Sequence, residues 1–154
     1  MSAPSHRGPE GGATLIEAMI VVAIVGTLLS VAVPTFLGSR SSGQDAAAQR
    51  SLRTALTAAD AAFTAHRSFA DAGAAALAGS NFSLHYAAGK IVSTAPTSVS
   101  VTNEADGWSA AAQSESGTCY FIAATPGGRV FYGTASDGPC SGDGARNGAR
   151  RNTW

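Results

Sequence analysis

The longest apolar stretch of the chain covers residues 13–33. Residues 15–33 contain eleven Leu, Ile or Val residues and a single ionisable side chain, Glu17. Folded as a helix, the whole stretch would be about 31 Å long, which matches the hydrocarbon core of a bilayer. The aliphatic side chains favour insertion by on the order of 5 kcal/mol, whereas one acid at the bilayer centre opposes insertion by about 3 kcal/mol. The pattern therefore predicts a membrane-spanning helix over residues 13–33.

Pro34 follows the apolar stretch and affects the helix beyond it. Proline lacks a backbone N–H and clashes with the preceding turn, which costs about 3 kcal/mol in a helix interior. Gly38 and Gly43 weaken the segment further. Two alternatives remain: one long helix with a kink at Pro34, or two helices with Ser42 as the N-cap of the second. We favour a continuous but soft helix, in which residues 34–67 form the kinked continuation.

Residues 44–67 have the period of an amphipathic helix. Apolar side chains recur there at steps of three and four, and most charged residues lie off that stripe. The apolar positions are Ala48, Leu52, Ala55, Leu56, Ala59, Ala62 and Phe63. We expect this stripe to cover a sheet as part of the hydrophobic core, so it implies no cofactor site.

After an Ala-, Gly- and Ser-rich connection at residues 68–80, the apolar period changes to two, which is typical of strands. The alternation predicts strands at residues 82–86, 91–92, 99–101, 108–112, 118–124 and 129–133. The sequence Thr-Pro-Gly-Gly at residues 125–128 predicts a hairpin between the last two strands. Short strands without intervening helices favour an antiparallel sheet. We therefore expect an α+β fold, with the long helix packed on a small, mainly antiparallel sheet in a β-rich domain at residues 68–140.

The start of the apolar stretch carries a motif. Gly12 is followed by Ala-Thr-Leu-Ile-Glu-Ala-Met at residues 13–19. This sequence resembles the processing site of type IV prepilins, the class III signal peptide. The resemblance implies that residues 1–12 are a leader, that a prepilin peptidase cuts between Gly12 and Ala13, and that the new N-terminus is methylated. It also makes Glu17 the fifth mature residue, where the family keeps an acid, and places Pro34 near the bend of the family's helix.

The acid inside the apolar stretch requires an explanation, because an isolated charge is costly in a low-dielectric layer. Cleavage would create an α-amino group at Ala13, close to Glu17. If subunits stagger along a filament axis, Glu17 of one subunit could meet the Ala13 amine of its neighbour, and docking would neutralise both charges. We therefore predict that Glu17 is an assembly residue. The alternative is an acid near the helix end that only reaches the membrane surface.

Cys119 and Cys140 are the two cysteines of the chain. Their spacing is too long for a Cys-x-x-Cys redox motif, and no histidine cluster accompanies them for zinc. A disulfide is expected in a small extracytoplasmic domain, and it would stabilise the fold by on the order of 3 kcal/mol. Two buried free thiols are the alternative. The resembled pilins also carry a C-terminal cysteine pair.

Composition argues against several classes of function. Charged residues make up 13% of the chain and its net charge is zero, so no global field attracts it to nucleic acid. The Gly-, Asn- and Arg-rich residues 141–154 predict a flexible C-terminal tail, and we expect its arginines to be solvated rather than to bind nucleic acid. No phosphate-binding loop, metal-ligand spacing or Ser–His–Asp set stands out. We therefore expect no enzymatic activity, cofactor or metal.

Together with the apolar stretch, the resemblance implies a structural subunit of a type IV pilus-like filament that serves adhesion, motility or DNA uptake. The resemblance implies a single-pass protein of the cytoplasmic membrane before assembly, and a pilus at the cell surface afterwards. Expected partners are the membrane, the prepilin peptidase, the pilus assembly machinery, and other copies or other pilins through the N-terminal helix. One alternative is a pseudopilin of a type II secretion or DNA-uptake system, although such pseudopilins often lack a late disulfide. The other is a membrane-anchored binding module that does not polymerise.

Overall fold

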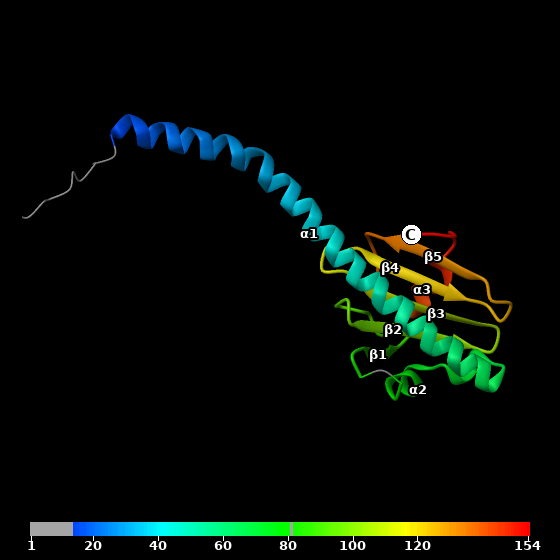
Figure 1. Cartoon of the computed structure of the whole chain (residues 1–154). Helices are drawn as coiled ribbons and strands as arrows, with labels where there is room; N and C mark the ends of the chain where they lie inside the picture. Colours follow the sequence, from blue (N-terminus) through cyan, green and yellow to red (C-terminus); the bar gives the residue numbers. More distant parts are fainter. Residues whose placement is uncertain (1–13, 81) are drawn as a thin grey trace, which may run out of the picture. The chain divides into compact units, whose positions relative to one another are not determined.

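The computed structural model describes residues 14–80 and 82–154 (Figure 1). By its internal contacts the chain divides into two units, Met1–Ser39 and Arg40–Trp154. Helix α1 (Leu15–His66) begins in the first unit and ends in the second. All the other helices and strands of the described residues belong to the second unit, which therefore holds the sheet and its core.

Both ends of α1 follow from local chemistry. At its start the Thr14 hydroxyl accepts a hydrogen bond from the Glu17 backbone N–H at 3.3 Å. At its end Arg67 has a φ of 59°, and its N–H donates to the Phe63 carbonyl at 2.7 Å; this left-handed geometry is a common helix stop. Between these ends α1 is helical through Pro34. The helix is thus continuous, and the alternative of a second helix capped by Ser42 is wrong.

Five strands form one sheet in the order β1-β2-β3-β4-β5. They are β1 His85–Ala88, β2 Ser98–Glu104, β3 Gly107–Gln113, β4 Cys119–Ala124 and β5 Val130–Ala135. Strands β2 to β5 pair antiparallel, including the predicted β4–β5 hairpin, whereas β1 pairs with β2 in parallel. The expected α+β class with a mainly antiparallel sheet is therefore confirmed.

The strands predicted before residue 98 differ from those observed. The strand expected at residues 82–86 begins only at His85, and residues 91–92 lie outside the strands. Because β1 and β2 are parallel, the chain must cross back along the sheet between them, and residues 89–97 form this crossover. Ile91 and Val92 consequently lie in the crossover, where they are 58% and 42% exposed.

The connection between α1 and the sheet contains two short helices, η1 (Phe69–Asp71) and α2 (Ala74–Ala78). The Ser68 hydroxyl caps η1 by accepting a hydrogen bond from the Ala70 N–H at 3.1 Å. Phe69 is buried and stacks on Phe63, with 4.6 Å between the ring centroids. Leu77 of α2 is also buried, so the connection contributes to the core.

In the second unit a helix packs on each face of the sheet. We call the face toward α1 the first face, and the face toward helix α3 (Gly142–Gly148) the second face (Figure 1). The first-face core joins the α1 stripe to alternate strand residues, among them Ala48, Leu52, Ala55, Ala59, Val99, Val101, Trp108, Ala110, Ala112, Tyr120, Ile122 and Ala124. Leu56, Ala62 and Phe63 pack against this core and are partly buried. The predicted stripe of residues 44–67 is therefore confirmed.

Residues 141–154 fold onto the sheet, so the prediction of a flexible tail is wrong. The Ser141 hydroxyl caps α3 by accepting a hydrogen bond from the Gly144 N–H at 3.1 Å. Beyond α3, Arg151 forms an antiparallel bridge with Tyr132 of the edge strand β5. The Trp154 ring then packs edge-on against Tyr132, with 4.6 Å between the ring centroids.

Close backbone approach explains why this glycine-rich segment is ordered. A Cβ atom on Gly142 would lie 2.7 Å from the Thr102 backbone nitrogen, and one on Gly148 would lie 2.6 Å from the Phe121 ring. The Gly142 N–H donates to the buried Ser100 hydroxyl at 2.9 Å, and its carbonyl accepts from the Ser109 hydroxyl at 2.9 Å. Glycine composition alone favours disorder, but here glycine lets the backbone reach the sheet.

Candidate functional site

We call residues 15–33 the apolar segment. Its large aliphatic side chains are exposed in the isolated chain, from 46% at Val25 to 78% at Leu15. By length and composition, α1 is long and apolar enough to cross a membrane. Soluble monomers rarely expose an apolar surface of this extent, so the segment needs lipid or other protein around it.

The hydroxyl groups of this part of α1 are bonded within the helix. Thr27 donates to the Ile24 carbonyl at 2.7 Å, and Ser30 donates to the Thr27 carbonyl at 2.7 Å. Just beyond Pro34, Thr35 donates to the Ala32 carbonyl at 2.9 Å. A polar group without a partner is costly in a bilayer. Because these hydroxyl groups have partners, they do not oppose burial of the segment in lipid or among helices.

Glu17 lies in the first turn of α1 and is exposed. Thr14 and Glu17 have the Thr-x-x-Glu spacing of a capping box, and the Thr14 hydroxyl accepts the Glu17 N–H. An acid in the first turn also interacts favourably with the helix dipole. This capping role was missed in the sequence, although the spacing indicates it. Gly12 and Ala13 lie outside the described residues, so the cleavage and the pairing with the Ala13 amine stay predictions.

One side of the apolar segment is shaped by small residues. A shallow apolar hollow on the helix surface is lined by Leu15, Ala18, Met19, Val22 and Ala23. One turn beyond, a Cβ atom on Gly26 would meet nothing within 4 Å. Small side chains let a second helix approach closely in an apolar environment. This side of the helix is therefore suited to helix–helix contact.

The two cysteines form a disulfide, as expected, so the alternative of two free thiols is wrong. Cys119 at the start of β4 is bonded to Cys140, and their Cα atoms are 5.5 Å apart. Both are buried in the small core of the second face. The Cys140 carbonyl also accepts the Ser93 N–H at 2.7 Å. The disulfide thus anchors the chain to β4 just before α3 begins.

The loop between β3 and β4 is bonded to the part of α1 in the second unit. The Ser116 hydroxyl donates to the Asp45 carboxylate at 2.5 Å, and the Gln44 side-chain amide donates to Glu115 at 3.1 Å. Partial burial acts to raise the pKa of Asp45, but hydrogen bonds from Ser116, Ser114 and Tyr120 outweigh burial and hold that pKa below its usual value. The ionised form of Asp45 is therefore the form that stabilises this contact.

Helix α3 leaves part of the second face uncovered. Thr102, Ser109, Ala123 and Phe131 are consecutive partners across β2, β3, β4 and β5, and they form one row on this face. The two middle side chains of the row are small. A cavity of about 470 Å³ lies over them, lined also by the end of α3 and the residues after it. We call this cavity the second-face hollow.

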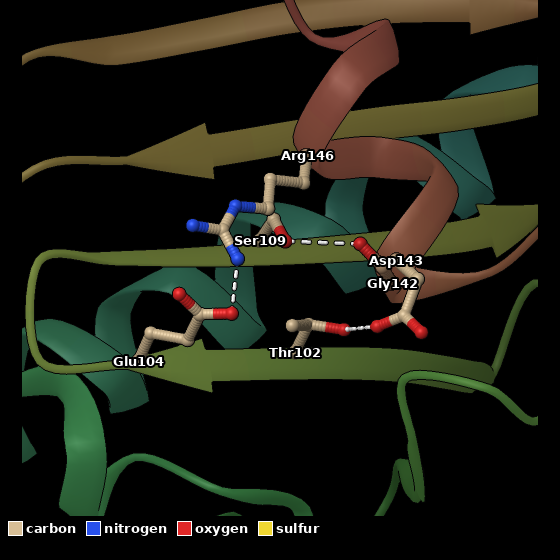
Figure 2. Close-up of polar contacts among 6 residues, drawn as sticks. All are labelled: Thr102, Glu104, Ser109, Gly142, Asp143 and Arg146. Atoms are coloured by element: carbon tan, nitrogen blue, oxygen red, sulfur yellow. Dashed lines mark hydrogen bonds and ion pairs between the residues drawn. The ribbon is translucent and has the colours of Figure 1, made fainter.

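Figure 2 shows the polar contacts that hold α3 beside this hollow. The Thr102 hydroxyl donates to the Asp143 carboxylate at 2.5 Å. Arg146 of α3 reaches toward β2 and forms an ion pair with Glu104, in which both side chains are about half exposed. These contacts could not be predicted from the sequence, because they join residues about forty positions apart.

The chain is thus an α+β protein whose first helix is long and apolar enough to span a membrane. In the part of the chain that the structure describes, no group of three or more His, Cys, Asp or Glu side chains could hold a metal ion. Comparisons with family models, curated proteins and solved structures find no match for the chain. Its function has to be argued from its own residues.

Proposed function

We propose that the chain is a structural subunit of a type IV pilus-like filament, processed by a prepilin peptidase and assembled through its N-terminal helix. The observation that carries this proposal is the exposed apolar segment of α1, attached to a unit that has its own buried core. A bilayer would cover the segment before assembly, and the helices of neighbouring subunits would cover it in the filament. The small residues Ala18, Ala23 and Gly26 favour that exchange, because they permit close helix packing.

In this proposal Glu17 selects subunits for assembly. Its carboxylate is costly in the membrane and is neutralised when it meets the Ala13 amine of a neighbouring subunit. The capping box offers a competing explanation, in which Glu17 only stabilises the first turn of α1. The two explanations differ in whether the negative charge is needed.

Glu17→Gln separates the two explanations, because glutamine can occupy the third helical position of a capping box but carries no charge. Cells that produce only this variant should contain normal amounts in the membrane fraction, and strongly reduced amounts in sheared surface filaments. Glu17→Ala, which removes both the cap and the charge, should behave the same way. Incorporation of Glu17→Gln into filaments at the wild-type level would contradict the proposed role of the charge.

The second unit would form the outer surface of the filament. It would carry any adhesion, motility or DNA-uptake role, without catalysis. Its disulfide and folded C-terminal segment suit an extracellular location, because an oxidising environment preserves disulfides. Before assembly the protein would reside in the cytoplasmic membrane as a single-pass subunit, and afterwards at the cell surface.

A further inference from the structure

The second-face hollow has the dimensions of a ligand site. Its volume of about 470 Å³ lies within the range of about 300–1,000 Å³ that is typical of small-molecule pockets. The hollow exists because Ala123 is small and α3 packs beside it rather than over it: Gly142 of α3 lies against Thr102, and Gly148 lies against Phe121 in the neighbouring row. The Ser109 hydroxyl already donates to the Gly142 carbonyl, which leaves Ala123 and Phe131 as the apolar floor.

Two arginines line the hollow from the C-terminal segment. Arg146 and Arg150 are four residues apart, and both contribute to its wall. In residues 14–80 and 82–154 the one ion pair is that between Arg146 and Glu104, so Arg150 has no carboxylate partner among them. Its Nε–H donates to the Asn147 carbonyl at 2.6 Å, which constrains the guanidinium while other N–H groups remain to bind an acceptor. Arg150 can therefore bind a carboxylate without losing an internal ion pair.

The other residues that line the hollow limit which further chemical groups a ligand can carry. Phe131 is an aromatic surface at one end of the floor, and the Arg129 guanidinium carbon lies 5.2 Å from its ring centroid. At the turn between β2 and β3, Asp106 and Glu104 also line the hollow, and their charges disfavour a second anionic group. The lining thus combines an apolar floor, one arginine without a carboxylate partner and a nearby acidic side.

We propose that the second-face hollow binds an apolar monocarboxylate, with its carboxylate on Arg150 and its apolar body over Ala123 and Phe131. The pair of Arg146 and Glu104 is half exposed and therefore weak, so Arg146 can exchange Glu104 for the ligand. The ligand is either a free small molecule or the C-terminal residue of a peptide, since both present a carboxylate beside an apolar side chain. The site does not depend on the proposed filament.

Titration of the full chain in detergent micelles with N-acetyl-L-phenylalanine tests the site. Amide ¹H–¹⁵N spectra should show saturable shifts at Ser109, Ala123 and Ala149. The neutral N-methylamide of the same compound should bind about ten-fold more weakly, because it lacks the charge-assisted contact to arginine. A tripeptide ending in phenylalanine, with a free C-terminus, distinguishes the two sources: tighter binding than the free compound indicates a peptide ligand, and equal or weaker binding indicates a small molecule.

Variants sharpen the test. Arg150→Gln should weaken binding of N-acetyl-L-phenylalanine about ten-fold, while Arg50→Gln, an exposed position on α1, is the matched control and should leave it unchanged. Ala123→Leu should fill the hollow and abolish the shifts. The proposal is overturned if the wild-type chain shows no saturable shifts, if the neutral analogue binds equally well, or if Arg150→Gln binds like the wild type.

Discussion

The two units of the chain place the same kinds of side chain in opposite environments. In the apolar segment Leu28 is 67% exposed, whereas Leu52, on the same helix but in the second unit, is fully buried. The first part of α1 is apolar on all sides, while the second part has a single apolar stripe. A helix that is apolar all round needs covering on every side. Residues 40–154 therefore stabilise themselves, and residues 15–33 depend on what surrounds them.

The largest expected effect comes from shortening a buried leucine. Leu52→Ala should lower the free energy of unfolding of the second unit by about 2–5 kcal/mol, because it leaves a cavity against the sheet. Leu28→Ala is the matched control and should leave that stability unchanged. Denaturant unfolding followed by tryptophan fluorescence measures both. Equal losses in the two variants would contradict the division into a self-stabilised unit and a dependent segment.

A smaller loss is expected where the C-terminal segment meets the sheet. A methyl group on Gly142 would lie 2.7 Å and 2.8 Å from backbone atoms of Thr102 and Val101, which cannot rotate away. Gly142→Ala should therefore cost about 1–3 kcal/mol, with faster hydrogen exchange in α3. A Cβ atom on Gly127 meets nothing within 4 Å, so Gly127→Ala is the control. Unchanged stability of Gly142→Ala would refute the close approach.

The smallest effect concerns pH. Hydrogen bonds outweigh burial and hold the pKa of Asp45 below its value in the unfolded chain. The ionised carboxylate therefore stabilises the fold above the unfolded-state pKa, and this stabilisation is lost as pH falls through the folded-state pKa. Thermal unfolding should show that Asp45→Asn is less stable than the wild type at about pH 6, and that the difference shrinks toward about pH 2. Asp137→Asn, in an exposed loop, is the control. A difference that stays constant with pH would argue against the ionised contact with Ser116.

The sequence predicted the features that depend on local periodicity. The apolar stretch, the stripe around Leu52 and the hairpin after β4 each depend on residues within one segment, and the structure contains all three. The sequence did not predict that β1 runs parallel to β2 or that residues 141–154 are folded. Glycine is compatible both with disorder and with close packing, and only the sheet opposite Gly142 and Gly148 decides between them.

Of the candidate sites, one could be predicted from the sequence and the other could not. Glu17 stands out in the sequence because it is the one ionisable side chain of residues 15–33, although its capping geometry with Thr14 was missed. The second-face hollow could not be found in the sequence. Its floor needs the register of four strands, and Arg146 and Arg150 reach it only because the C-terminal segment returns to the sheet.

The most direct test of the central claim, that a processed N-terminal helix assembles into filaments, is the intact mass of the chain purified from its native membranes and surface filaments. Our proposal predicts a mature chain that begins at Ala13 and carries an N-terminal methyl group. A native chain that still begins at Met1 would contradict it, and would favour a membrane-anchored domain that does not polymerise.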